Sequence, residues 1–165
     1  MKITIGRLKG LIKESLSDEE DFDKWYNERE RKNEQDLYKS SEEFLDLRDD
    51  LIMYGFKKAK NSRTVDPNKR FNLEHYSGLM LSASMLSASK IFVQFQLKLK
   101  DQRQRGLTMF LEPILKDREF MLEKVQAEDV VNWVLIMLKK QASLSKFSHD
   151  DIEIIQDTMR ELELS

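Results

Sequence analysis

Glycine and proline are scarce in this chain, with five glycines and two prolines among 165 residues. Both residues interrupt regular secondary structure and mark turns, so their scarcity favours long helices joined by few short loops. Few segments alternate apolar and polar residues with an enrichment in β-branched side chains, which is the signature of strands. We therefore expect an all-α fold, a single bundle of about five or six helices with little or no sheet.

Apolar periodicity and capping residues indicate where these helices lie. Residues 19–60 are typical of one long helix, or of two in line, with a polar section at 27–36 that offers almost no apolar face. A helix that is polar all round either bridges solvent or frays, so this section could project as an arm. The other expected helices cover about 72–106, 107–125 and 128–143, and a last one begins where Ser148 and Asp151 have the spacing of a capping box.

Charge is segregated along the chain, although the net charge is only −2. Residues 14–50 carry 15 acidic against 6 basic residues, whereas residues 57–105 carry 11 basic against 3 acidic residues. Blocks of opposite sign favour pairing between elements within the fold. The chain has no cysteine, and its longest apolar run is far shorter than the roughly 18 residues that cross a bilayer. We therefore expect a cytoplasmic protein that does not bind membranes.

Small side chains are concentrated in the stretch GLMLSASMLSAS at 78–89. Small residues let the backbone of another helix approach closely. The stretch VVNWVLIML at 130–138 is apolar on nearly every side, which is typical of a central helix or of an oligomer interface. We expect a homo-oligomer, and the residues that we assign to self-association are Gly78, Ser82, Ala88 and Trp133.

Basic residues cluster around the turn signal Asp66-Pro67. Clusters of this kind can neutralise phosphates, so a helical protein associated with nucleic acid is one alternative. Against it, no nucleic-acid reader motif is present and aromatic residues are not interleaved with the cluster. The residues of this basic cluster are Lys57, Lys58, Lys60, Arg63, Lys69 and Arg70.

Residues that could carry catalysis are few. Neither His75 nor His149 has a partner at the spacing of helical metal motifs, and no phosphate-binding or nucleophile motif is present. Glu42, Glu43 and Asp46 resemble the paired acids of all-helical nucleotide pyrophosphohydrolases, but no second acid pair completes a magnesium site. A metal-dependent hydrolase on these three acids is a second alternative, and we expect no enzymatic activity, no metal and no cofactor.

The chain opens with a basic stretch, MKITIGRLKGLIKESL, whose apolar residues follow helical spacing. Each of its two glycines weakens a helix by about 1 kcal/mol relative to alanine, so this helix needs a surface on which to dock. We expect residues 1–16 to form an amphipathic helix that hooks into a groove of a protein partner, and residues 17–165 to form a single helical domain. The residues that would anchor the hook are Ile5, Leu8, Ile12 and Leu16.

The same opening resembles a short motif at the start of various proteins of tailed bacteriophages. The motif has a lysine-rich start, a Leu-Lys-x-Leu/Ile-Ile-Lys-Glu core and an acidic continuation. The resemblance implies a phage origin and an assembly or virion-associated role, in the host cytoplasm or the virion, and it implies no catalytic residue. Together these patterns predict a non-enzymatic protein that binds a protein partner or takes part in assembly. The matching residues, about a tenth of the chain, are Lys2, Leu8, Lys9, Leu11, Ile12, Lys13 and Glu14.

Overall fold

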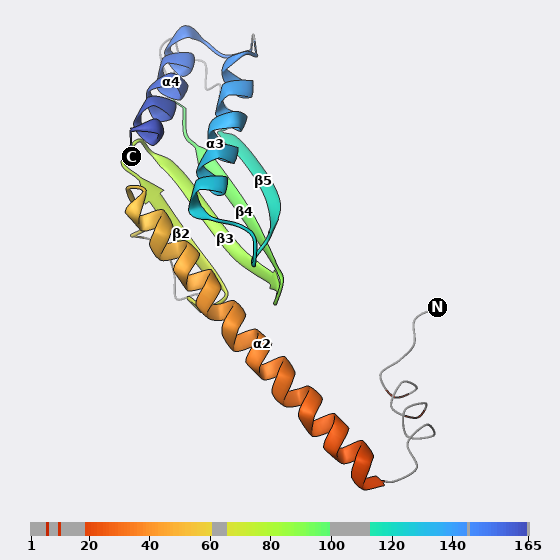
Figure 1. The fold of residues 1–165 in the computed structure, drawn as a ribbon. Helices are drawn as coiled ribbons and strands as arrows, with labels where there is room; N and C mark the ends of the chain where they lie inside the picture. The colour runs from red at the N-terminus through yellow and green to blue at the C-terminus, as the bar shows by residue number, and fades with distance from the viewer. Residues whose placement is uncertain are drawn as a thin grey trace. The chain divides into compact units, whose positions relative to one another are not determined.

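The structure is a computed structural model that describes residues 6, 10, 19–60, 66–99, 113–144 and 146–164. The chain divides into two compact units, residues 1–39 and residues 40–165. The predicted domain boundary after residue 16 lies outside the described residues. The described elements, labelled in Figure 1 where space allows, are α2 (Glu19–Met53), β1 (Phe56–Lys58), β2 (Arg70–His75), β3 (Leu79–Ser87), β4 (Lys90–Leu97), β5 (Ile114–Met121), α3 (Ala127–Ala142) and α4 (His149–Glu163).

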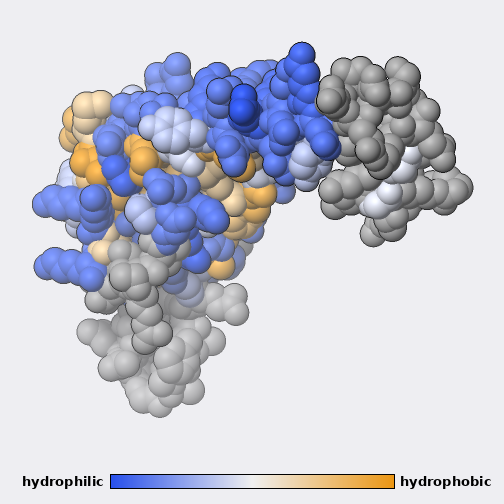
Figure 2. Space-filling view, turned by 90° about the horizontal axis from the view of Figure 1, so that it is seen from below, coloured by the Kyte–Doolittle hydropathy of each residue, from blue (hydrophilic) through white to orange (hydrophobic). Residues whose placement is uncertain are grey.

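The first unit contains the first part of α2, up to residue 39. Every side chain from residue 27 to residue 39 is exposed, and the surface of this part of α2 is largely hydrophilic in Figure 2. The guanidinium of Arg29 lies 5.2 Å from the ring centre of Trp25, a contact between residues one helical turn apart. The predicted polar section is therefore helical. None of the described helices is long and apolar enough to cross a membrane.

The expectation of an all-α bundle is wrong, because the second unit contains a five-stranded antiparallel sheet. The strands lie in the order β1-β2-β3-β4-β5, so each strand pairs with its neighbour in the sequence (Figure 1). Strands β2 to β4 replace the helix expected at 72–106, and β5 lies within the helix expected at 107–125. Together with the helices, the sheet makes this an α+β fold.

Alternating burial explains why these segments form strands. In β4 the side chains of Ile91, Val93 and Phe95 are buried while the residues between them are only half-buried. In β3, Leu79 and Leu81 are buried in the same two-residue period. A two-residue period matches the pleat of a strand, and a helix would have placed the same side chains on different faces.

Tight turns join the central strands. Between β2 and β3, the backbone N–H of Gly78 donates to the carbonyl oxygen of His75 at 2.9 Å. Gly78 has a φ of 87°, a left-handed conformation that glycine adopts without steric cost. Between β3 and β4, Ser87 pairs with Lys90, which leaves a two-residue hairpin loop beside a bulge in β3.

The hydrophobic core lies between one face of the sheet and the three helices. The second part of α2 packs there through Phe44, whose ring centre lies 4.8 Å from that of Phe71. On α3, Trp133 packs edge-on against Phe95 at 5.3 Å between ring centres and against Phe120 at 5.8 Å. Helix α4 adds buried apolar side chains to the same cluster. Figure 1 shows α3 and α4 in front of the sheet.

The helices expected near the C-terminus are confirmed. Helix α3 spans Ala127–Ala142, close to the predicted 128–143, and most of its apolar side chains are buried. Helix α4 begins after Ser148, whose hydroxyl accepts the backbone N–H of Asp151 at 3.2 Å. The carboxylate of Asp151 in turn accepts the backbone N–H of Ser148, so the predicted capping box is present.

Candidate interaction surface

One face of the sheet carries the helices, and the described helices leave the other face uncovered; we call the latter the open face. The strand register aligns its side chains in rows that run across the sheet. One row holds Arg70, Ser84, Phe92 and Glu119, the next holds Asn72, Ser82, Gln94 and Asp117, and the third holds Lys57, Glu74, Met80, Gln96 and Leu115.

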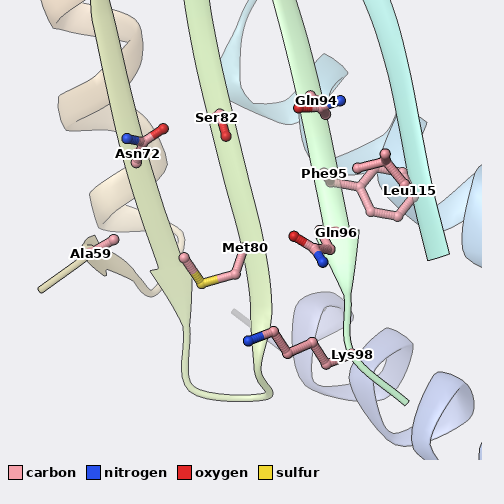
Figure 3. A pocket seen from close by; sticks show the side chains of 9 residues that line it. All are labelled: Ala59, Asn72, Met80, Ser82, Gln94, Phe95, Gln96, Lys98 and Leu115. Atoms are coloured by element: carbon pink, nitrogen blue, oxygen red, sulfur yellow. The ribbon is translucent and has the colours of Figure 1, made fainter. Parts of the chain in front are cut away.

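The centre of the open face is uncharged. Side chains of Asn72, Ser82 and Gln94 extend from three neighbouring strands to the same side of the sheet (Figure 3). With Met80, Gln96 and the exposed Lys98 just after β4, they line a shallow hollow of about 240 Å³. In a chain with 35% charged residues, an uncharged patch of this kind matches the centre of protein–protein interfaces, from which charged residues are depleted.

Charged residues border this centre, and those on the outer strands are separated by sign, whereas Lys90 and Lys98 stand at the two ends of β4. Lys57 and Arg70 lie on β1 and β2, whereas Asp117 and Glu119 lie on β5 at the opposite side of the sheet, and all four are exposed. Glu74, which pairs with Lys57 in the register, offsets part of the basic side. No ion pair joins Arg70, Asp117 or Glu119 to another described residue. The open face therefore has a basic side and an acidic side.

The residues predicted for self-association lie in different environments. Ser82 is at the centre of the open face. Gly78 forms the turn before β3, and the carbonyl oxygen of Ala88 accepts a hydrogen bond from the hydroxyl of Ser40 at 2.6 Å. Trp133 is buried in the core.

The predicted basic cluster is divided by the strands. Lys57 and Arg70 face the open side, whereas Lys58 pairs with the buried Leu73 and so belongs to the helix-covered face. Lys60 and Lys69 lie in exposed turns, and Arg63 lies outside the described residues. The open face also carries acidic residues, so the structure does not gather the cluster into one continuous basic patch.

The predicted acidic cluster lies on α2, where Glu42 and Asp46 are exposed and Glu43 is half-buried. Within the described residues, no group of three or more histidine, aspartate or glutamate side chains is arranged to hold a metal ion. His149 is exposed at the start of α4, whereas His75 is buried on the helix-covered face. Burial lowers the pKa of His75 below its usual value of 6.5.

Sequence reasoning missed the amide side chains of the open face, Asn72, Gln94 and Gln96. The signal that could have found them is the alternation of apolar residues and glutamines in IFVQFQL at 91–97. The hook residues Ile5, Leu8, Ile12 and Leu16, and the phage-like motif to which some of them belong, lie outside the described residues.

No protein-family model, no curated protein and no solved structure shows a significant match to this chain.

Proposed function

We propose that this chain is a non-enzymatic assembly protein that self-associates through the open face of its sheet. The observation that carries the proposal is the uncharged centre with a basic side at β1 and β2 and an acidic side at β5. A surface with opposite charges on its two sides is complementary to a second copy of itself. The virion-associated role and the nucleic-acid and hydrolase alternatives stay predictions from the sequence.

The charge pattern selects one symmetry for the dimer. A twofold axis parallel to the strands that passes between β3 and β4 places β2 of one copy over β5 of the other, so opposite charges meet. Arg70 then faces Glu119 of the partner subunit, because both residues belong to one row across the sheet. A twofold axis across the strands, along the middle row, would instead place Asp117 over its own copy and leave Glu119 over Leu115. Strands β3 and β4 flank this axis, so Ser82 on β3 lies close to it.

The size of the open face sets the strength of the dimer that we expect. Five strands about 4.8 Å apart, of three to nine residues each, make a face on the order of 550 Å² per copy. Specific interfaces bury about 800 Å² per partner, so this face lies at the weak end of the range. We therefore expect a dimer that dissociates on dilution.

Reversing the charge of Arg70 or of Glu119 tests the proposal. Arg70→Glu places a carboxylate opposite Glu119 of the partner subunit, and Glu119→Arg places two guanidinium groups opposite each other. Because twofold symmetry repeats each pair, either change should weaken dimerisation about tenfold. The double variant Arg70→Glu with Glu119→Arg restores opposite charges and should dimerise as the wild type does. Sedimentation velocity over a concentration series measures all four proteins.

Glu153→Arg is the matched control, because Glu153 is exposed on α4 and away from the open face. It makes the same charge change as Glu119→Arg and should leave dimerisation unchanged. The proposal is wrong if the wild type stays monomeric at every concentration, or if the double variant is no better than the single ones.

A further inference from the structure

Strand β5 forms one edge of the sheet, and no described strand pairs with its outer edge. It is eight residues long, whereas β1 at the other edge has only three. An unpaired edge of this length presents a row of backbone donors and acceptors to which another strand can add. Only β5 offers such an edge among the described strands.

A groove of about 400 Å³ lies between β5 and α3. Its apolar lining includes Phe120, Val125, Trp133 and Ile136. Trp133 and Phe120 pack edge-on against each other there, and Ile136 on α3 is 53% exposed. An apolar groove alongside an open strand edge is the arrangement by which domains bind extended peptides, with the backbone pairing to the strand and alternate side chains entering the groove.

Three basic side chains without ion pairs to described residues lie near this groove. The side chains of Lys116 and Arg118 lie on the helix-covered face of β5, because they pair with the buried Phe95 and Val93. Arg118 stacks over Phe120 at 4.9 Å from the ring centre, and Lys124 lines the groove beside it. No ion pair joins Lys116, Arg118 or Lys124 to another described residue.

The two acidic residues in the lining offset only part of this positive charge. Asp129 caps its own helix by accepting the backbone N–H of Gln126 at 2.8 Å. Glu119 belongs to the open face, since neighbouring residues of a strand point to opposite sides. An acidic side chain on a bound strand would therefore find basic partners beside the groove.

A second copy of β5 is a poor occupant in antiparallel pairing. Two antiparallel edge strands related by a twofold axis keep their helices on the same side, so residues of the helix-covered faces stand opposite each other. In the two longest registers Lys116 faces Arg118, or Arg118 faces its own copy. Like charges directly opposite each other destabilise a strand pair.

We propose that β5 and this groove bind an extended segment of another protein as a sixth strand. The segment carries an acidic residue beside Arg118 and, two positions away, an apolar residue that enters the groove at Ile136. The spacing of two follows from the alternation of side chains along a strand. This site is separate from the uncharged centre of the open face, so it can hold or fail independently of the proposed self-association.

Selection from a displayed library of random peptides of about ten residues, roughly the length of a strand, tests the proposal on the full chain. Peptides with an acidic and an apolar residue two positions apart should be enriched. Their affinity, measured by fluorescence anisotropy, should fall at least tenfold in Arg118→Glu and in Ile136→Arg. Both changed residues are exposed, so these variants should keep the fold. Lys139→Glu, an exposed change on α3 outside the groove lining, should bind as the wild type does.

Hydrogen–deuterium exchange with the same peptides bound measures the protection of the β5 backbone amides. An added strand must pair with the outward backbone amides of β5, so their exchange should slow on binding. The proposal is overturned if no peptide is enriched, if the enriched peptides lack the two-residue spacing, if the groove variants bind as well as the Lys139→Glu control, or if β5 is not protected.

Discussion

His75 is held in its neutral form by its surroundings. Its ring is fully buried, 5.2 Å between ring centres from Phe56 and 4.2 Å from Tyr76. Nδ1 accepts from Ser77, whose backbone N–H lies 3.4 Å away and whose hydroxyl lies 2.8 Å away. Because a backbone N–H can only donate, Nδ1 carries no proton and Nε2 does. Nε2 has no partner among the described residues, and burial lowers the pKa of the ring.

This lowered pKa predicts that acid destabilises the fold. Below about pH 6.5 the unfolded chain binds a proton at His75 that the folded chain does not, so the free energy of unfolding falls as pH falls from 6.5 toward the folded pKa. This one residue contributes a slope of at most about 1.4 kcal/mol per pH unit. Urea unfolding between pH 7.5 and 5 measures the slope in the wild type and in His75→Gln.

Between pH 7.5 and 5, the free energy of unfolding should fall less in His75→Gln than in the wild type. This holds whatever the stability of the variant at pH 7.5. His149→Gln is the control, because it makes the same replacement at an exposed histidine, and the fall in His75→Gln should be smaller than in this variant too. Equal slopes in the wild type and His75→Gln would show that His75 does not couple folding to pH.

At the scale of single elements, the capping box makes the start of α4 the most sharply specified boundary in the chain. The Ser148 hydroxyl accepts the backbone N–H of Asp151 and donates to its carboxylate at 2.6 Å, and the Asp151 side chain is buried. Ser148→Ala removes both bonds, so it should lower the free energy of unfolding by about 1–2 kcal/mol. Chemical denaturation measures the change.

Ser143→Ala gives a matched comparison, because Ser143 is an exposed serine at the other end of a helix, where its hydroxyl donates to the carbonyl oxygen of Lys140 at 2.7 Å. This bond caps no helix N-terminus, so Ser143→Ala should lower the free energy of unfolding clearly less than Ser148→Ala does. If both serine variants lose the same stability, the cap at Ser148 is not what defines the start of α4.

The helices could be predicted from the sequence because their signals are local. Helix α4 has its capping box, and α3 has the apolar stretch at 130–138, which spans about two and a half turns. The strands were mispredicted because β3 consists mainly of leucine, serine, alanine and methionine, whose small and flexible side chains fit either a helix or a strand. Its partners on β2 and β4 decide between the two, and pairing between strands is not a local signal.

The candidate site could not be predicted for the same reason. A helix over residues 72–106 would have scattered Asn72, Ser82 and Gln94 over different turns. In the sheet, the register brings these three residues from three strands into one row. Ser82 was predicted to mediate self-association because it is small, and the structure gives it a different setting, the centre of an uncharged sheet face.

At the scale of the whole molecule, a meander of neighbouring strands with its helices on one face leaves the other face available to a partner. The charges of that face are divided between its two sides, and no described residue neutralises Arg70 or Glu119. A second copy related by a twofold axis parallel to the strands would cover this face and bring Arg70 opposite Glu119 of the partner subunit. These features support the proposed self-association through the open face.

Cross-linking at Ser82 tests the proposed dimer through the open face. The chain has no cysteine, so Ser82→Cys introduces a single thiol near the expected axis, with little change in side-chain size. Two sheets packed face to face lie about 10 Å apart, a distance that a short bis-maleimide spans. Asn132→Cys, exposed on α3, is the control. We predict that Ser82→Cys forms covalent dimers efficiently and Asn132→Cys does not. Equal yields from both variants, or no dimer from Ser82→Cys, would show that the open face is not the dimer interface.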